Sequence, residues 1–260
     1  MSLCRGWDAA GHIVGASWNR SPGEALRWGD REIPRHTAID PQSAGASAIC
    51  LAVADDALPR VAHMLARAPW PSPSPLVFHL AGSVSLDALE PLARRGAITG
   101  SLHPLRSFPE AILRGGVLDG HLCAVTSDSE DGRRRLQRLA RDVGGRPVDL
   151  DDGDRAAWHL AGVAGSNFLV AMMDFAEQQM ARAGMDVETA RAGLTLLAEG
   201  ALRAVREVGP AKALTGPVAR GDRSTLERHR RCLADHPRSS EVYEALVAYM
   251  TARLGESSGD

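Results

Sequence analysis

Short apolar runs alternate with helix-like segments along the first 150 residues, and this alternation constrains the fold most strongly. Each run ends in small or polar residues, and helical patterns separate several of them. The runs expected to form strands are His12–Trp18, Ala48–Val53, Leu76–Leu80, Ala97–Leu102, Leu122–Thr126 and Arg146–Leu150, with helices up to about Ala68, at Asp87–Arg95 and at Ser129–Val143. Strands and helices at this spacing predict an α/β fold with a mostly parallel, doubly wound sheet. Ligands of such sheets bind beyond the carboxyl ends of the strands.

The pattern becomes purely helical after the acidic segment 151–154. We expect a helix over Arg155–Ala183, and a second that restarts with Asp186 as its N-cap. Further signals are a break at Gly209-Pro210, a capping-box pattern of Ser224 with Glu227, and a last helix over about Glu241–Leu254. The sequence therefore predicts two domains, a sheet domain over residues 1–151 and an all-helical domain over residues 152–260.

Composition excludes several classes of protein. With 44% hydrophobic and 24% charged residues, the 260-residue chain has the balance of a soluble globular protein. Its net charge of −2 predicts no general attraction to nucleic acid or anionic lipid. Cys4, Cys50, Cys123 and Cys232 form no CxxC pair, so we expect reduced thiols in a cytoplasmic protein and no metal site. Polar residues interrupt the apolar stretch Leu160–Phe175, which predicts a buried helix rather than a membrane span.

Short polar segments follow the expected strands and are candidate cofactor ligands. Asn19-Arg20-Ser21 follows the first run, and an arginine beside small polar groups suits the 2′-phosphate of NADP, where an acidic residue would suit NAD. The alternative is an ordinary polar turn. Val53-Ala54-Asp55 and Ala81-Gly82-Ser83 follow the next two central runs, and we expect them to line the ribose and the nicotinamide.

Four segments together carry a resemblance to a known family: His79–Ser83, Gly100–Phe108, Trp158–Asn167 and Ala213–Asp222. From about Leu3 to Leu254 the chain resembles bacterial Rossmann-like proteins with a helical C-terminal domain of unknown function, within the 6-phosphogluconate dehydrogenase-like superfamily. The superfamily includes ketopantoate reductase, prephenate dehydrogenase and pyrroline-carboxylate reductase. The resemblance implies hydride transfer with a nicotinamide cofactor and a homodimer joined through the helical domains.

The sequence departs from that family in two places. No Gly-x-Gly-x-x-Gly phosphate loop occurs, and Leu3–His12 resembles only the last turns of the helix that follows such a loop. We therefore expect the first strand and the loop to be missing, which an incorrectly assigned start site would explain. Several relatives place a catalytic lysine four residues before an asparagine. Asn167 matches that asparagine, but Val163 stands at the lysine position and the chain's one lysine is Lys212.

Two histidines are candidates to replace the lysine. His103 lies at the end of a predicted strand before Pro104, is similar to the histidine of the prephenate dehydrogenase His-Pro turn, and titrates near neutrality, so it suits a proton donor. The alternative is a structural histidine in a proline turn. His159, Ser166 and Asn167 form a polar stripe on the expected 155–183 helix, which faces either a cleft or solvent. His79 is expected to hydrogen-bond in the core.

These observations favour an NADP(H)-dependent oxidoreductase acting on an unidentified small polar or acidic substrate. His103 would donate the proton, while Ser101, His159, Ser166 and Asn167 orient the substrate. Arg220 would bind a substrate carboxylate or phosphate, although its segment also suits a structural connector. The alternative function is a non-catalytic, dimeric ligand-binding or interaction protein on a degenerate Rossmann scaffold.

Overall fold

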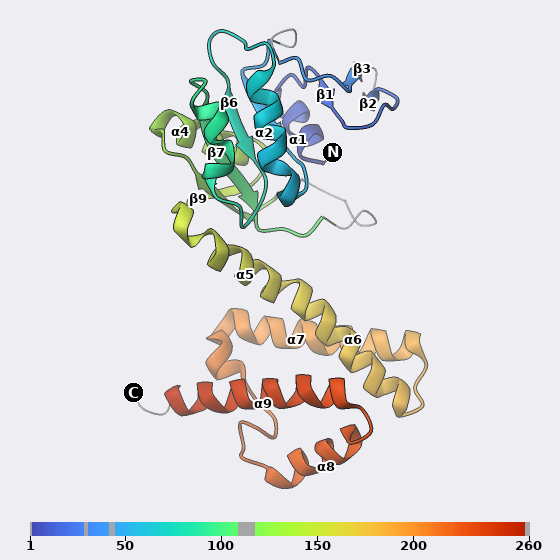
Figure 1. Cartoon of the computed structure of the whole chain (residues 1–260). Coiled ribbons are helices and arrows are strands. Elements are labelled where there is room, and N and C mark those ends of the chain that lie inside the picture. Colours follow the sequence, from blue (N-terminus) through green and yellow to red (C-terminus); the bar gives the residue numbers. More distant parts are fainter. Residues whose placement is uncertain (1, 29–30, 42–44, 109–117, 258–260) are drawn as a thin grey trace. The chain divides into compact units, whose positions relative to one another are not determined.

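The computed structural model describes residues 2–28, 31–41, 45–108 and 118–257. It contains two compact units, Met1–Ser166 and Asn167–Asp260, of which the first holds the sheet and the second is helical (Figure 1). The division falls later than the expected boundary after residue 151. The difference arises because helix α5 (Arg155–Gly165) makes its contacts within the first unit.

The main sheet has five strands in the order β5-β6-β7-β8-β9. Their bounds are Ala48–Leu51 (β5), Leu76–His79 (β6), Ile98–Pro104 (β7), Leu122–Thr126 (β8) and Arg146–Asp149 (β9). Strand β8 runs antiparallel to β7, and the other three neighbouring pairs are parallel. The expectation of a mostly parallel sheet with helices is therefore confirmed, and five of the six predicted strands lie in it.

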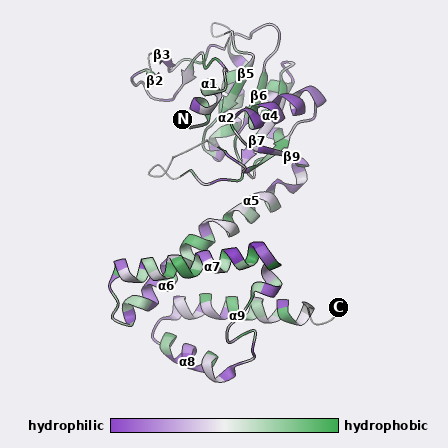
Figure 2. Ribbon diagram, turned by 180° about the vertical axis from the view of Figure 1, so that it is seen from behind, coloured by the Kyte–Doolittle hydropathy of each residue, from purple (hydrophilic) through white to green (hydrophobic). Residues whose placement is uncertain are grey.

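Helices cover both faces of this sheet. Side chains of successive strand residues point to opposite faces, so each strand packs against both layers. On one face, Leu76 and Phe78 pack with α4 (Glu130–Asp142) and with Trp7 of α1 (Ser2–Ala9). On the other, Val77 packs with α2 (Leu58–Arg67) and with the segment formed by η2 (Leu86–Leu89) and α3 (Glu90–Ala93). The helix pattern of α4 places Leu136 and Ala140 in the core and its arginines toward the outside. Figure 2 colours the helices by hydropathy.

Helix α1 is held against α4 by a hydrogen bond and against β6 by a ring contact. The indole Nε1 of Trp7 donates to the Leu139 carbonyl at 2.8 Å. The Trp7 ring also meets Phe78 edge-on, with centroids 6.0 Å apart. The imidazole of His12, just beyond the helix, lies 2.8 Å from the Asp142 carboxylate. These contacts fix the beginning of the chain to one face of the sheet.

The first predicted strand is wrong in its length and its partner. Of the expected His12–Trp18, only β1 (Ser17–Trp18) is a strand, and it pairs in parallel with β4 (Arg35–His36) in a separate two-stranded sheet. Strands β2 (Leu26–Trp28) and β3 (Arg31–Ile33) form another two-stranded sheet. Residues 12–16 do not pack an apolar face on the core, and Ile13 is 86% exposed. Within the described residues, β5 pairs only with β6, so the first run adds nothing to the main sheet.

The second unit consists of α6 (Asn167–Arg182), α7 (Val187–Ala213), α8 (Arg223–Leu233) and α9 (Pro237–Ser257). Two predicted boundaries are confirmed: the Asp186 carboxylate caps α7 by accepting from the Thr189 amide at 2.9 Å, and Gly209, at φ 78°, kinks α7. The N-cap of α8 is Asp222 rather than Ser224, because its carboxylate accepts from the Thr225 amide at 3.1 Å.

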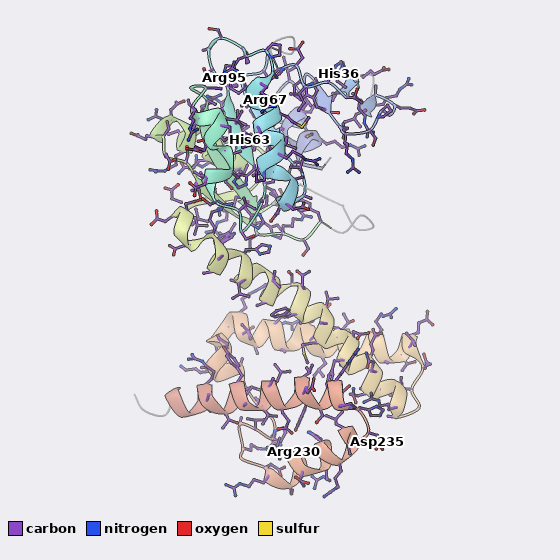
Figure 3. All side chains as sticks on the ribbon, in the orientation of Figure 1. His36, His63, Arg67, Arg95, Arg230 and Asp235 are labelled. Atoms are coloured by element: carbon purple, nitrogen blue, oxygen red, sulfur yellow. The ribbon has the colours of Figure 1, made fainter. Side chains whose placement is uncertain are left out.

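Helices α8 and α9 are joined by a two-pronged ion pair. The guanidinium of Arg230, labelled in Figure 3, donates from Nε and Nη2 to the two Glu244 carboxylate oxygens at 2.8 and 3.1 Å. Both side chains are about two-fifths exposed. This contact orients two helices of the second unit but lies near the surface, so its contribution to stability is small.

The expected continuous helix over Arg155–Ala183 is divided at Ser166, which lies between α5 and α6 with non-helical φ/ψ. Its hydroxyl donates to the Gly162 carbonyl at 2.6 Å, a bond that often bends helices. The expectation that Leu160–Phe175 is buried is also wrong: Leu160, Phe168 and Val170 are 60%, 55% and 70% exposed. By length and composition alone, Asp152–Arg182 would suffice to cross a membrane, but one such helix is weak evidence of a span.

Candidate functional site

A row of polar side chains crosses the middle of the sheet. In the strand register His79 of β6 is opposite Ser101 of β7, and Ser101 is opposite Thr126 of β8. Matched residues on neighbouring strands point to the same face. The three are 0%, 0% and 6% exposed, so this face has a polar row inside an otherwise apolar core. Buried polar groups are costly without hydrogen-bond partners.

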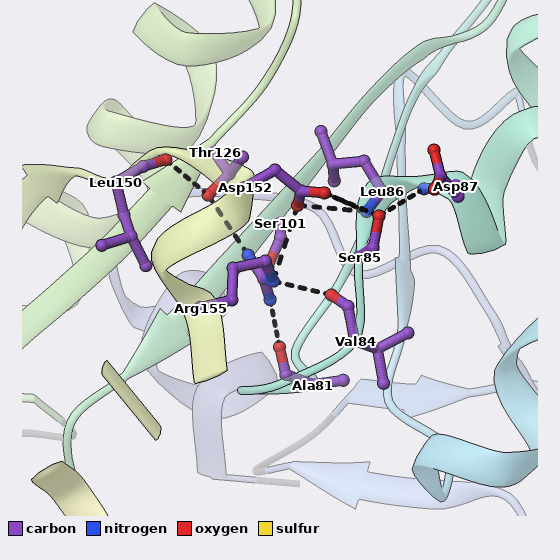
Figure 4. A network of polar contacts seen from close by, with 10 residues as sticks. All are labelled: Ala81, Val84, Ser85, Leu86, Asp87, Ser101, Thr126, Leu150, Asp152 and Arg155. Carbon is purple, nitrogen blue, oxygen red and sulfur yellow. Dashed lines mark hydrogen bonds and ion pairs between the residues drawn. The ribbon is translucent and has the colours of Figure 1, made fainter. Parts of the chain in front are cut away.

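Arg155 supplies most of those partners (Figure 4). It is the first residue of α5 and only 1% exposed. Its Nη2 donates to the Ser101 hydroxyl at 2.8 Å and to the Ala81 carbonyl, and its Nη1 donates to Thr126 Oγ1 at 3.2 Å. Its Nε donates to the Val84 carbonyl at 2.6 Å. The guanidinium therefore joins two strands, β7 and β8, to the β6–η2 loop, which we define as residues 80–85.

Asp152 makes a second connection to the end of the same loop. Its carboxylate accepts from the Ser85 hydroxyl at 2.6 Å and from the Leu86 amide at 3.1 Å, and it lies 3.7 Å from Nε of Arg155 (Figure 4). Both residues come from η4 (Asp152–Asp154) and the beginning of α5. The β6–η2 loop is thereby tied at Ala81, Val84, Ser85 and Leu86, and Gly82-Ser83 lies between the ties.

Gly82 packs directly beneath two imidazole rings. The rings of His103 and His159 have centroids 5.9 Å apart and meet at 64°. A Cβ at position 82 would lie 2.5 Å from Cδ2 of His159 and 2.8 Å from Nε2 of His103. The third helix turn of α5 approaches the same strand end, because Gly162 faces the Leu105 side chain. The structure thus brings together two predicted catalytic residues, His103 and His159, and the predicted cofactor residue Gly82.

The tautomer of His103 follows from its hydrogen bond. Nδ1 lies 2.9 Å from the Leu80 carbonyl, which only accepts, so Nδ1 carries a proton and Nε2 is the site that gains or loses one. Burial lowers the pKa of His103 below its ordinary 6.5. The bond to Leu80 opposes this shift, while the charges of His159 and Arg155 add to it.

His79 is fully buried, as expected, with a main-chain contact at Ala81 and no side-chain hydrogen-bond partner among the described residues. Burial, with the charge of Arg155, lowers its pKa to about 4, so the ring is neutral at physiological pH. His79 is thus a neutral core histidine beneath the β6–η2 loop.

The other predicted site residues are distributed over the chain. Val53, Ala54 and Asp55 follow β5 and are exposed, and Ser83 follows β6, so they lie at the same sheet edge as Gly82 because these strands are parallel. Asn19-Arg20-Ser21 follows β1 in the separate sheet, where the Asn19 side chain donates to Ser17 Oγ. The Ser101 hydroxyl is buried and accepts from Arg155, and its expected contact with a substrate stays a prediction. Asn167 and Arg220 belong to the second unit, and Ser166 lies at the end of the first.

The division at Ser166 corrects the predicted polar stripe. The stripe required His159, Ser166 and Asn167 on one helix, whereas α5 ends at Gly165 and α6 begins at Asn167. The Ser166 hydroxyl is directed to a carbonyl of its own helix. Within the first unit, His159 of the stripe lies beside His103.

Arg155 and Asp152 are not among the site residues that the sequence predicted. A signal was present: His79, Ser101 and Thr126 are polar residues inside three apolar runs. The strand register is needed to see that they form one row. Once it is known, the row of buried polar groups requires a hydrogen-bond donor. An arginine at the first position of the next helix meets that need.

The strand ends fit part of a nicotinamide cofactor. Ala54, Gly82 and Ser83 are small, which allows close approach to the backbone beyond β5 and β6, and the half-buried His103 lies at the end of β7. The sequence has no glycine-rich loop to hold the pyrophosphate. Within the described residues, no group of three or more His, Cys, Asp or Glu side chains could hold a metal ion.

Comparison with known proteins places the chain in a family. Residues 121–250, half of the chain, match the domain of unknown function DUF2520, and residues 1–104 match a Rossmann-like domain. The chain belongs to the DUF2520 family. In this DUF2520 protein, the matched region begins before β8 and so includes part of the sheet as well as the helices. No curated protein matches it.

Solved structures share the fold of this DUF2520 protein. A candidate NADP oxidoreductase, BF3122 of Bacteroides fragilis, superposes with a TM-score of 0.76 at 20% identity, covering 96% of this chain and 93% of that one. Protein TM1727 of Thermotoga maritima gives 0.66 at 22% identity, covering 86% and 83%. The reductive aminase of Aspergillus terreus in complex with NADPH and ethyl levulinate gives 0.68 at 18% identity, covering 98% and 90%. At these identities the likeness establishes the fold.

Proposed function

We propose that this protein is an NADP(H)-dependent oxidoreductase acting on a small polar or acidic substrate. The observation that carries the proposal is the seat of His103: Nδ1 is fixed by the Leu80 carbonyl, and Nε2 lies against Gly82 at the ligand-binding edge of the sheet. The names of the Bacteroides and Aspergillus neighbours support the same class of reaction.

The chemistry assigns separate tasks to the cofactor and to the protein. Bound NADPH would supply the hydride that reduces a carbonyl or imine carbon. The imidazolium of His103 would donate its Nε2 proton to the oxygen or nitrogen of that group, while Nδ1 keeps its bond to Leu80. His159 would orient the substrate beside His103. Asn19, Arg20 and Ser21 would bind the 2′-phosphate, and Val53–Asp55 with Gly82-Ser83 would line the ribose and nicotinamide.

The test is a thermal-shift and fluorescence titration with NADPH and NADH. A ligand at 100 times its dissociation constant stabilises the folded protein by about 2.7 kcal/mol, which raises the melting temperature measurably. We expect NADPH to stabilise the protein more than NADH. A cooperatively melting protein that responds to neither nucleotide would contradict the proposal and favour the non-catalytic binding protein.

A second experiment tests the reaction. The protein is incubated with NADPH deuterated at C4 and a panel of small oxo acids and cyclic imino acids. We expect deuterium in a reduced product, and its transfer to be about 100 to 10,000-fold slower with His103→Gln. Binding of NADPH without deuterium transfer to any member would support a cofactor-binding protein whose substrate lies outside these classes.

We also propose that two copies associate through the helical unit. Its helices expose apolar side chains, among them Val170 on α6, Leu196 and Leu197 on α7 and Tyr249 on α9, which are 67–72% exposed. Exposed apolar surface of this kind suits a protein interface.

A further inference from the structure

The most unusual group in the first unit is a buried arginine with little charge compensation. Arg155 is 1% exposed, and its one ion-pair partner among the described residues, Asp152, is half-buried with the nearest atoms 3.7 Å apart. Hydrogen bonds to neutral oxygens use four of its five N–H donors. Such a buried charge is costly, and apolar residues often stabilise a core equally well. We therefore looked to the hydrogen bonds of Arg155 for a role other than stabilising the core.

That geometry fixes the backbone on both sides of Gly82. The planar guanidinium binds the carbonyls of Ala81 and Val84 at once, and the strand residues Ser101 and Thr126 fix the guanidinium itself (Figure 4). A lysine has the charge but cannot reproduce this fork of donors. The Leu80 carbonyl, one residue before Ala81, holds Nδ1 of His103. The loop that Arg155 holds is therefore the loop on which the imidazole of His103 is seated.

We propose that Arg155 is a positioning residue, which fixes the β6–η2 loop so that Gly82 seats His103 and His159 in the arrangement used for proton transfer. Arg155 touches neither the reacting atoms nor the substrate. This inference rests on the proposed function for its catalytic meaning, but the seating itself is a property of the protein without any ligand. The charge of Arg155 also contributes to the lowered pKa of His103.

The test compares Arg155→Lys with a matched control, Arg95→Lys. Arg95, labelled in Figure 3, also donates to a main-chain oxygen, that of Ala66, and packs over Trp70 outside the β6–η2 loop. The readouts on the ligand-free protein are amide hydrogen exchange at residues 80–85 and NMR titration of the histidine Cε1–H signals. We expect Arg155→Lys to speed exchange in the loop about tenfold and to shift the His103 and His159 signals. Arg95→Lys should leave both unchanged.

A milder variant covers the case in which Arg155→Lys does not fold. Thr126→Val keeps the side-chain shape but removes the acceptor of Nη1, so the fork loses one of its supports. We expect a smaller change of the same kind in loop exchange and in the two histidine signals. If the folded variants leave the loop and both histidines as in the wild type, Arg155 is a core residue only and the inference is wrong.

NADPH affinity separates this inference from the proposed function. A misplacement of about 1 Å at a reacting group can cost ~100-fold in rate, so Arg155→Lys should lower deuterium transfer by up to that factor. If wild-type protein binds no NADPH but the loop and histidine signals respond to Arg155→Lys, the positioning role stands and the proposed function fails. If wild-type protein transfers deuterium and Arg155→Lys transfers it at the same rate, the inference fails alone.

Discussion

Nε2 of His103 lies against the α-carbon of Gly82, so close that the space of a single methyl group is already taken by the two imidazoles. Glycine is needed here because a Cβ would collide with the two rings, and not because of its backbone conformation. The same contact links the carboxyl end of β6 to α5, because His159 forms the other side of it. Substitution of this glycine is therefore the most direct perturbation of the histidine pair.

Gly82→Ala should displace both rings. The added methyl would meet atoms at 2.5 and 2.8 Å, so we expect a loss of about 1–3 kcal/mol in the free energy of unfolding, measured by urea denaturation, and shifted His103 and His159 NMR signals. Gly153→Ala is the control in the same unit, because nothing lies within 4 Å of its added methyl. Equal stability of the two variants would show that the rings move aside freely.

Acid should destabilise the protein through His79. The unfolded chain binds a proton near pH 6.5, but the folded protein resists protonation until about pH 4, so stability is full above 6.5 and falls as the pH drops toward 4. The loss from this one group amounts to about 3 kcal/mol. His79→Leu should flatten the pH dependence of unfolding in this window, measured by denaturant titrations. His63→Gln, at an exposed position of α2, should not. An unchanged slope in His79→Leu would show that folding does not lower the pKa of His79.

His103→Gln should separate chemistry from binding. Loss of the proton donor is expected to lower turnover by about 100 to 10,000-fold on any panel compound that wild-type protein reduces, with little change in NADPH affinity. Because reduction uses the imidazolium, wild-type turnover should rise as the pH falls through the His103 pKa, which lies below 6.5. Wild-type rates in the variant would remove His103 from the mechanism, and a rate that falls with acid would assign the opposite protonation state.

The sequence predicted the sheet well and the site only in part, for a physical reason. Apolar runs indicate burial, and they predicted the ends of the five strands of the main sheet to within one or two residues. Register is set by long-range pairing, so nothing local showed that His79, Ser101 and Thr126 share a row, or that Arg155 would lie across it. The same limit applies to His12–Trp18, whose composition suits a strand but which finds a partner only at Arg35–His36.

Arg20→Ala should lower the affinity for NADPH and leave that for NADH unchanged, because only NADPH carries the 2′-phosphate that the guanidinium would bind. Isothermal titration with both nucleotides measures the two affinities. Arg27→Ala is the control, since Arg27 is an exposed arginine of β2 in the same region of the chain, 3.4 Å from Glu32. Parallel losses for both nucleotides would place Arg20 near a shared part of the cofactor instead.

A charge on the exposed apolar face of the helical unit should dissociate the proposed homodimer. Val170→Asp and Leu197→Glu each introduce a carboxylate at a site about 70% exposed in the single chain, so the fold of the monomer should tolerate them. Burial of that carboxylate between two copies would be costly, because it would have no partner there. Sedimentation velocity should show a dimer for wild-type protein and a monomer for the variants, with wild-type circular dichroism. Glu199→Asp, an exposed position on α7 that keeps its charge, is the control. Dimers that survive both substitutions would place the interface elsewhere, and a wild-type monomer would leave these apolar side chains in solvent and end the proposal.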